Sequence, residues 1–235
     1  MSPKALSSGT LEEGQVRAMF DRIAGVYDVM NSVMTAGLHH RWRQRAVDLA
    51  RVGPGSRALD VATGTGDLAI ALAARGAEVV GSDFSAGMLE RARAKSGAVR
   101  WEHGNALELA YPDDSFDAAT VGFGARNFSD LAQGLREMTR VVRPGGRVVV
   151  LEITTPTRPP LSTFFSLWFD RIVPLLGRIS GEDQAYSYLP SSVKRFPGPH
   201  ELGAAMVAAG LTEVRWILTA GGIIALHSGT VDGQR

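Results

Sequence analysis

The sequence predicts an α/β fold in which an open, mostly parallel β-sheet carries helices on both faces. Short apolar segments alternate with helical segments along most of the chain, which is the pattern of consecutive βα units. The first apolar segment ends in a glycine turn that leads into a helix, an arrangement typical of nucleotide-like ligand sites. A chain of 235 residues is long enough to bury such a sheet in one domain.

The order of the elements follows from apolar periodicity and from residues that begin or end helices. Residues 16–50 are predicted to be helical with a turn at Gly37. Ser85 and Ser129 are favoured N-caps, and Pro144-Gly145-Gly146 is expected to end a helix. The other predicted helices are Leu68–Arg75, Ser85–Lys95, Ser129–Val142 and His200–Ala209. The predicted strands are Ser56–Ala62, Glu78–Ser82, Val99–His103, Phe116–Val121, Arg147–Ile153, Thr212–Thr219 and Gly222–His227, the last two joined by a hairpin turn at Gly221-Gly222.

Two segments depart from this alternation, and both are interpreted as additions to a single domain that spans residues 1–235. Residues 16–50 are expected to form a helical lid that packs on the ligand site, with plain core packing as the alternative. Residues 154–199 are rich in proline and aromatic side chains, and are interpreted as an insertion that covers the substrate.

Composition excludes several classes of protein. A net charge of +1 gives no overall basic field, so no nucleic-acid partner is expected. The chain has no cysteine, which excludes disulfides, thiolate metal sites and a cysteine nucleophile. No apolar run reaches about 18 residues, so no transmembrane helix is expected. Residues 1–15 have no signal-peptide pattern, and the expected location is cytoplasmic.

The main candidate site is the loop Asp60-Val61-Ala62-Thr63-Gly64-Thr65-Gly66-Asp67, between the first strand and its helix. Its glycines let a ligand approach the backbone, and the free amides of the helix start face that ligand. Gly64-x-Gly66-x-x-Ala69 also satisfies the dinucleotide fingerprint, so an NAD-dependent oxidoreductase is a rival interpretation. A non-catalytic binding module is a second rival.

Charge favours a cationic ligand in this loop. Asp60 and Asp67 bracket it, and a pyrophosphate beside them would cost on the order of 1 kcal/mol per close pair. S-adenosyl-L-methionine has no phosphate and carries a sulfonium and an ammonium, so it is the expected cofactor. The loop residues expected to hold it are Asp60, Thr63, Gly64, Thr65 and Gly66.

The ends of the following strands extend the predicted cofactor site. Asp83 ends the second strand, where a carboxylate can accept hydrogen bonds from ribose hydroxyls. Asn105 and Ala106 follow the third strand, where an amide can meet the adenine. Phe84 and Gly122 complete the set. The alternative roles are helix capping for Asp83, a plain turn for Asn105 and dipole stabilisation for Asp67.

Several motifs resemble those of the menaquinone and ubiquinone C-methyltransferases, over roughly residues 17 to 228. These motifs are Phe20–Asn31 (FDRIAGVYDVMN), Gly37–Arg43 (GLHHRWR), Gly122–Asn127 (GFGARN), Arg143–Gly146 through Leu151-Glu152, Tyr186-x-Tyr188-Leu189, Ser192-Val193, Phe196-Pro197, and Thr219–His227 (TAGGIIALH).

This resemblance implies a Rossmann-like class I methyltransferase fold, with a seven-stranded, mostly parallel sheet whose last strand is antiparallel. It implies methylation of a ring carbon of demethylmenaquinol, the last step of menaquinone biosynthesis, with donor contacts at Thr65, Asp83, Asn105 and Ala106. Gly122 stands where ubiquinone-pathway members often have serine, which favours the naphthoquinone branch. A benzoquinol of the ubiquinone pathway, or another lipophilic acceptor, remains the alternative substrate.

Carbon methylation needs an electron-rich carbon, which a quinol provides when a ring hydroxyl loses its proton. Arg126 and Asn127 follow the fourth strand and are the predicted catalytic pair, with Arg126 stabilising phenolate charge. The alternative for Arg126 is an ion pair with Asp130. Tyr186, Tyr188 and His227 are further candidates for the hydroxyl contact, with packing as the alternative for the tyrosines.

The expected substrate is a lipophilic isoprenoid quinol, so the protein is expected to meet the inner face of the membrane as a peripheral protein. The apolar stretch Leu161–Leu176 is the predicted contact, with Arg158, Arg171 and Arg178 beside lipid head groups. A homodimer is expected if the chain forms any oligomer. No metal is expected, because the adjacent His39 and His40 do not share a helix face.

Overall fold

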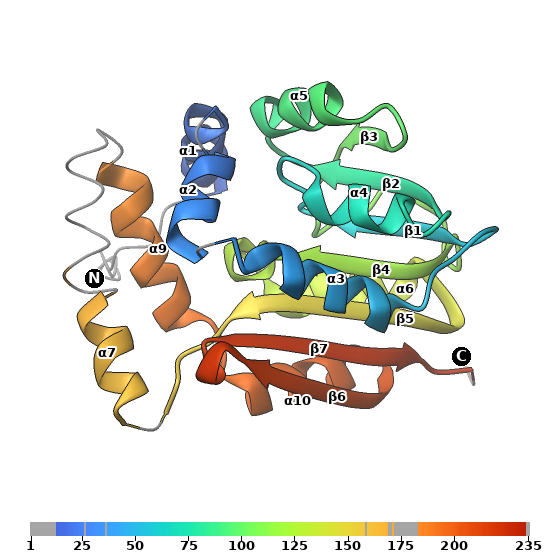
Figure 1. Ribbon diagram of the computed structural model, residues 1–235. Coiled ribbons are helices and arrows are strands. Elements are labelled where there is room, and N and C mark those ends of the chain that lie inside the picture. The colour runs from blue at the N-terminus through green and yellow to red at the C-terminus, as the bar shows by residue number, and fades with distance from the viewer. Residues whose placement is uncertain are drawn as a thin grey trace, which may run out of the picture.

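A twisted sheet forms the centre of the molecule in the computed structural model (Figure 1). The structure describes residues 13–25, 27–35, 37–157, 159–168, 171 and 183–233. In this part of the chain the sheet has seven strands, in the order β3-β2-β1-β4-β5-β7-β6. The strands are β1 (Arg57–Val61), β2 (Glu78–Asp83), β3 (Arg100–His103), β4 (Phe116–Gly122), β5 (Val142–Ile153), β6 (Leu211–Thr219) and β7 (Ile224–Val231).

Strands β1 to β5 pair in parallel, whereas β7 lies antiparallel to both β5 and β6. The prediction of a mostly parallel sheet with an antiparallel last strand is therefore confirmed. A short 3-10 turn, η3 (Ala220–Gly222), joins β6 to β7, and its Gly221 and Gly222 both have positive φ. This conformation suits glycine, which is why the hairpin turn falls there.

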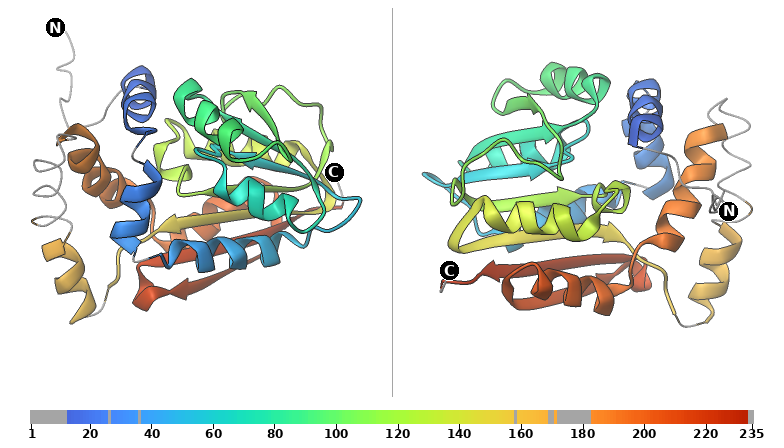
Figure 2. Two further views of the ribbon diagram at one scale, coloured as in Figure 1. Left: turned by 45° about the horizontal axis from the view of Figure 1, so that its top comes forward. Right: turned by 180° about the vertical axis from the view of Figure 1, so that it is seen from behind.

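Helices cover both faces of the sheet. Figure 2 shows α6 and α10 on the face opposite to α3 and α4. The helices are α1 (Glu13–Ile23), α2 (Tyr27–Thr35), α3 (His39–Ala50), α4 (Asp67–Ala73), α5 (Ala86–Lys95), α6 (Leu131–Arg140), α7 (Leu161–Leu167), α9 (Asp183–Arg195) and α10 (Pro199–Ala208). One buried cluster includes Val47, Leu72 and Val149, and another includes Leu135 and Met206.

Two predicted details around α6 are wrong. Asp130, not Ser129, is the N-cap of this helix, and its side chain accepts a hydrogen bond from the Gln133 amide at 2.9 Å. The helix ends at Arg140, so Pro144-Gly145-Gly146 lies within the start of β5 rather than at the helix end. The register between β4 and β5 shifts there, because the glycine turn is looped out of the pairing.

Helices α1, α2, α7 and α9 lie beyond the carboxyl ends of the parallel strands (Figure 1). Gly37 has a φ of 75°, which explains the predicted turn between α2 and α3. Within 154–199, Arg158, Phe169, Ile172, Val173, Leu175, Leu176 and Arg178 lie outside the described residues. Among the helices that are described, none is long and apolar enough to cross a membrane.

Candidate active site

A pocket is walled by the segments that follow β1, β2, β3 and β4. Its place agrees with the rule that ligands bind at the carboxyl ends of parallel strands. The lining includes nine of the predicted cofactor residues and one predicted catalytic residue: Asp60, Thr63, Gly64, Thr65, Asp83, Phe84, Asn105, Ala106, Gly122 and Asn127.

Gly66 is not among the residues that line the pocket. It is the N-cap of α4 with a φ of 86°, and a Cβ built on it would approach the Trp101 ring to 2.3 Å. Its requirement for glycine is therefore explained by backbone conformation and by packing against Trp101, rather than by ligand contact.

Asp60 supports the glycine loop from inside the protein. Its side chain is almost completely buried and accepts hydrogen bonds from the hydroxyls of Thr63 and Thr120, both at 2.6 Å. Burial raises the pKa of the Asp60 carboxyl to about 6, although the threonine hydrogen bonds act in the opposite direction. The carboxylate thus fixes the loop to β4 and lines the base of the pocket.

Asp83 connects the glycine loop to the start of α5. Its Oδ2 accepts a hydrogen bond from the Gly64 amide at 2.7 Å, and its Oδ1 accepts one from the Ser85 amide at 2.8 Å. Ser85 itself is the N-cap of α5, as predicted. Because a carboxylate can accept about four hydrogen bonds, Asp83 keeps acceptor capacity for a ligand hydroxyl.

Donor binding is expected to weaken at acid pH because Asp83 must be ionised to accept two hydroxyl donors. Burial raises its pKa from 3.8 to about 6. Affinity for S-adenosylhomocysteine should stay constant above pH 6 and fall by up to roughly tenfold per unit below it. Calorimetric titrations at several pH values check this. Asp83→Asn, which cannot titrate, should bind weakly with a flatter profile, and an equally steep profile in that variant would assign the effect to another group.

The raised pKa values of Asp60 and Asp83 have the opposite effect on stability: acid pH weakens donor binding but stabilises the fold through these two groups. Between about pH 4 and 6 the folded Asp60 and Asp83 hold protons that the unfolded chain has lost. These two groups therefore make the free energy of unfolding fall as the pH rises through this window. A loss of donor affinity below pH 6 would consequently not reflect unfolding caused by these carboxyls.

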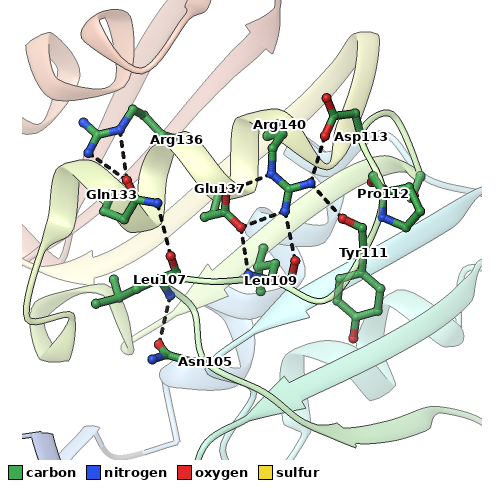
Figure 3. A network of polar contacts seen from close by, with 11 residues as sticks. Asn105, Leu107, Leu109, Tyr111, Pro112, Asp113, Gln133, Arg136, Glu137 and Arg140 are labelled. Carbon is green, nitrogen blue, oxygen red and sulfur yellow. Dashed lines mark hydrogen bonds and ion pairs between the residues drawn. The ribbon is translucent and has the colours of Figure 1, made fainter.

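Helix α6 holds the loop that carries Asn105 and Ala106 (Figure 3). Glu137 accepts a hydrogen bond from the Leu109 amide at 2.8 Å, and Arg140 donates to the carbonyls of Leu109 and Tyr111 at 2.9 and 2.7 Å. Closer to the pocket, Asn105 Oδ1 accepts a hydrogen bond from the Leu107 amide at 2.9 Å. This turn holds the Asn105 backbone beside the pocket that Asn105 lines.

Replacing Glu137 with alanine is expected to weaken donor binding although Glu137 does not line the pocket. The change leaves the amide of the buried Leu109 without its acceptor, which costs about 1–3 kcal/mol and loosens the loop. Calorimetry with S-adenosylhomocysteine and urea unfolding measure the two effects. Arg136→Ala is the matched control, since among the described residues the hydrogen bonds of Arg136 run to Gln133 on the same helix. Unchanged affinity in the Glu137 variant would show that the loop does not depend on α6.

Two cations of the protein lie beside Asp67, one of the two acids that bracket the loop. Arg43 on α3 lies 3.2 Å from Asp67, and Lys95 on α5 lies 2.7 Å from it. Burial would raise the pKa of Asp67, but these cations outweigh it and hold the pKa below its usual value. Lys95 also pairs with Asp28 of α2 at 2.6 Å. The negative charges of Asp28 and Asp67 are therefore compensated by cations of the protein.

Two aspartates fasten the N-terminal helices to this site. Asp28 accepts a hydrogen bond from the Thr65 hydroxyl of the glycine loop at 2.6 Å. Asp21 of α1 accepts hydrogen bonds from the Ser85 hydroxyl and the Gly87 amide, at 2.6 and 3.0 Å. Phe20 and Tyr27 line the pocket beside them, and their rings meet edge to face. These contacts place α1 and α2 against the site, whereas α3 packs on the sheet through Trp42, Ala46 and Val47.

Arg126 forms a buried ion pair with Glu152 at the end of β5, at 2.7 Å, and not with Asp130. Burial opposes the charge of Arg126, but Glu152 outweighs this effect and raises the pKa of the guanidinium, so Arg126 stays cationic. Its Nε has no hydrogen-bond partner among the described residues. The neighbouring Asn127 lines the pocket and accepts a hydrogen bond from the Tyr188 hydroxyl at 3.1 Å. Arg126, Asn127 and Tyr188 therefore lie together at one side of the site.

His227 is not brought to the pocket. It pairs with Val150 inside the sheet rather than at the carboxyl edge, where β5 ends at Ile153. Its Nε2 lies 2.9 Å from the Pro199 carbonyl, and its ring stacks on Trp216. Tyr186 lies in α9, and its side chain is outside the described residues. In the described part of the chain, no three His, Asp or Glu side chains are grouped to hold a metal ion.

Sequence reasoning missed three charged residues that act at or behind the pocket: Arg43, Lys95 and Glu152. Arg43 carried the clearest signal. It shares one helix face with Ala46, Val47 and Ala50, which are all buried. An arginine at an inward position of a helix indicates a buried partner or a ligand.

Comparison with known proteins agrees with this geometry. A demethylmenaquinone methyltransferase of Thermus thermophilus is 48% identical over 218 residues, which cover 90% of this chain and 99% of that protein. The enzyme of the same name from Deinococcus radiodurans is 47% identical and covers 89% of this chain and 90% of that protein. A SAM-dependent methyltransferase structure from Thermotoga maritima superposes with a TM-score of 0.66 at 20% identity, over 91% of this chain and 98% of the other, which shows the fold. Residues 9–231 match the ubiE/COQ5 methyltransferase family, and the chain belongs to that family.

Proposed function

We propose that the protein transfers a methyl group from S-adenosyl-L-methionine to a ring carbon of demethylmenaquinol, giving menaquinol. The observation that carries this proposal is the similarity to demethylmenaquinone methyltransferases, at 40–48% identity over nearly the whole chain. The pocket supports it, because the donor loop forms one wall and the aromatic side chains of Phe20, Tyr27, Phe123 and Phe128 contribute to the others. A flat naphthoquinol ring fits between such aromatic faces.

The reaction needs the ring carbon and the methyl group in line with the donor sulfur. Loss of a proton from one quinol hydroxyl raises electron density at the ring carbon, which then forms a bond to the methyl carbon. The methyl–sulfur bond breaks, and S-adenosylhomocysteine leaves as a neutral thioether. The ring carbon finally loses its hydrogen as a proton and the quinol oxygen regains one, which restores the aromatic ring, gives menaquinol and releases one proton overall. Positioning the two reactants can supply about 7–11 kcal/mol of the barrier.

Arg126 and Asn127 are proposed to act on the quinol oxygen. Asn127 Oδ1 accepts from Tyr188, so the amide N–H groups of Asn127 remain to donate to the oxygen. Arg126 is held behind it by Glu152, and its permanent positive charge stabilises the phenolate. The guanidinium of Arg126 is always protonated and cannot accept the quinol proton, so a water molecule is the proposed proton carrier.

The acceptor is tested by deleting the gene and measuring the quinone pool by mass spectrometry. A species one methyl group lighter than menaquinone should accumulate, and complementation should remove it. Accumulation of a benzoquinone precursor instead would support the ubiquinone-pathway alternative. An unchanged quinone pool would contradict the proposal.

Peripheral membrane contact is part of the proposal because the substrate carries an isoprenoid tail. Helix α7 exposes Phe164 and Leu167 by more than half, and Phe164 stacks on Trp168 with the ring centroids 6.2 Å apart. We propose that these exposed apolar side chains of α7 enter the lipid surface.

The double variant Phe164→Ser/Leu167→Ser is expected to lose flotation with anionic liposomes that the natural protein retains. Burial of each such side chain in lipid contributes roughly 1.5–3 kcal/mol, so the loss should be large. Val207→Ser is the matched control, since Val207 on α10 is as exposed as Phe164, at 57%. Equal flotation of the double variant and the natural protein, or no flotation of the natural protein, would contradict the proposal that α7 contacts the membrane.

A further inference from the structure

Arg43 is a buried cation on the inward face of α3. The residue is 7% exposed and lies on the same face as Ala46, Val47 and Ala50. Its guanidinium lies over the Phe123 ring, 5.8 Å from the centroid, and Arg43 lines the pocket. Burying a charge costs free energy unless ion-pair or hydrogen-bond partners compensate for the lost water. The partners of Arg43 therefore indicate its role.

The protein satisfies Arg43 only in part. Its Nη1 lies 3.2 Å from Asp67, but that carboxylate is shared with Lys95. The same Nη1 makes no hydrogen bond to any described residue, although it is buried. A guanidinium offers five N–H donors in a planar fork that matches two carboxylate oxygens. A donor without a partner at the wall of a pocket indicates a ligand with an anionic oxygen.

The methyl donor has such an oxygen pair at its amino-acid end. Methionine's α-ammonium and α-carboxylate form a zwitterion, so the site has to offer both signs of charge. The pocket is lined by three carboxylates, Asp60, Asp67 and Asp83, and Arg43 is the one basic residue in the described lining. We propose that Arg43 binds the α-carboxylate of S-adenosyl-L-methionine, an inference that rests on the proposed function.

This assignment orients the donor. Gly64, Thr65 and Asp83 line the same pocket as Arg43, and the ribose is expected at Asp83. With the carboxylate fixed at Arg43 and the ribose at Asp83, the sulfonium between them has little freedom to turn. Asp60 and Asp67 lie close to Arg43, since its charge lowers the pKa of both, and they are placed to face the α-ammonium.

The test compares two ligands that differ only in the carboxylate: S-adenosylhomocysteine and its decarboxylated analogue. Calorimetry on the full chain should show that the natural protein binds S-adenosylhomocysteine roughly 10- to 100-fold more tightly, as expected for a charge-assisted hydrogen bond. In Arg43→Gln this preference should disappear through weaker binding of S-adenosylhomocysteine, with the analogue unchanged. Arg43→Lys keeps the charge without the planar fork and should fall between the two.

Arg45→Gln is the matched control, because Arg45 is exposed on the same helix and does not line the pocket. It should retain the full preference. Equal affinity of the natural protein for both ligands would overturn the proposal, as would an equal loss of both ligands in Arg43→Gln and Arg43→Lys. If the natural protein binds neither ligand, the donor itself is wrong, which separates failure of the proposed function from failure at Arg43. Thermal melts show whether each variant is folded. If Arg43→Gln is unfolded, the comparison of the two ligands is made with Arg43→Lys.

Discussion

Replacing Asp83 with alanine is expected to abolish measurable donor binding. The variant loses the acceptor proposed for two ribose hydroxyls, each a charge-assisted hydrogen bond of about 1.5–3 kcal/mol, so affinity should fall by roughly 100-fold or more. It also leaves the Gly64 amide without the bond that now joins the glycine loop to β2. Both effects weaken the donor site, so Asp83→Ala is expected to cause one of the largest losses of donor affinity among single substitutions.

Calorimetry with S-adenosylhomocysteine measures this loss. Asp48→Ala is the control, because Asp48 is an exposed aspartate on α3 whose ion pair joins it to Arg75, away from the pocket lining. Its affinity should equal that of the natural protein. If Asp83→Ala keeps the affinity of the natural protein, the pocket assigned to the donor is wrong.

Replacing Arg126 with alanine is expected to reduce both stability and turnover. Glu152 is 1% exposed and would remain as a buried charge without its cation. Removing one partner of a buried ion pair typically costs about 3–5 kcal/mol of unfolding free energy. The proposed mechanism adds a second loss, since the phenolate would no longer be stabilised. Affinity for S-adenosylhomocysteine should change little, because Arg126 does not line the pocket.

A double variant separates these two effects. Arg126→Met/Glu152→Leu removes both charges, and an apolar replacement of a buried pair often restores stability. Urea unfolding should therefore show recovery relative to Arg126→Ala, while turnover with the quinol should remain low. Recovery of turnover together with stability would show that Arg126 has a structural role alone.

Much of the fold and of the donor site could be predicted from the sequence because both depend on local patterns. Alternating strands and helices imply a parallel sheet, and the carboxyl ends of parallel strands meet at one edge. Asp83, Asn105 and Gly122 are far apart in the sequence, yet each follows or ends a strand, and all three line the pocket. Ser85 was recognisable as a cap for the same local reason.

The rest could not be predicted because it depends on which helices meet in space. Arg43 and Lys95 lie on different helices, and only the packing of α3 and α5 beside α4 brings both to Asp67. Arg126 has an acid four residues later, but Asp130 caps α6 and the pair forms with Glu152 instead. His227 belongs to a matching motif, but the antiparallel direction of β7 carries it away from the ligand edge.

The most direct test of the function is methyl transfer by the purified protein. Demethylmenaquinol in detergent is incubated with S-adenosyl-L-methionine that carries a trideuterated methyl group, and the products are analysed by mass spectrometry. Appearance of menaquinol with one trideuterated methyl group on its ring carbon, together with S-adenosylhomocysteine in equal amount, is the predicted result. If the protein binds the donor but no label reaches the quinol, then the pocket is a binding site without this activity, and the proposed function is contradicted.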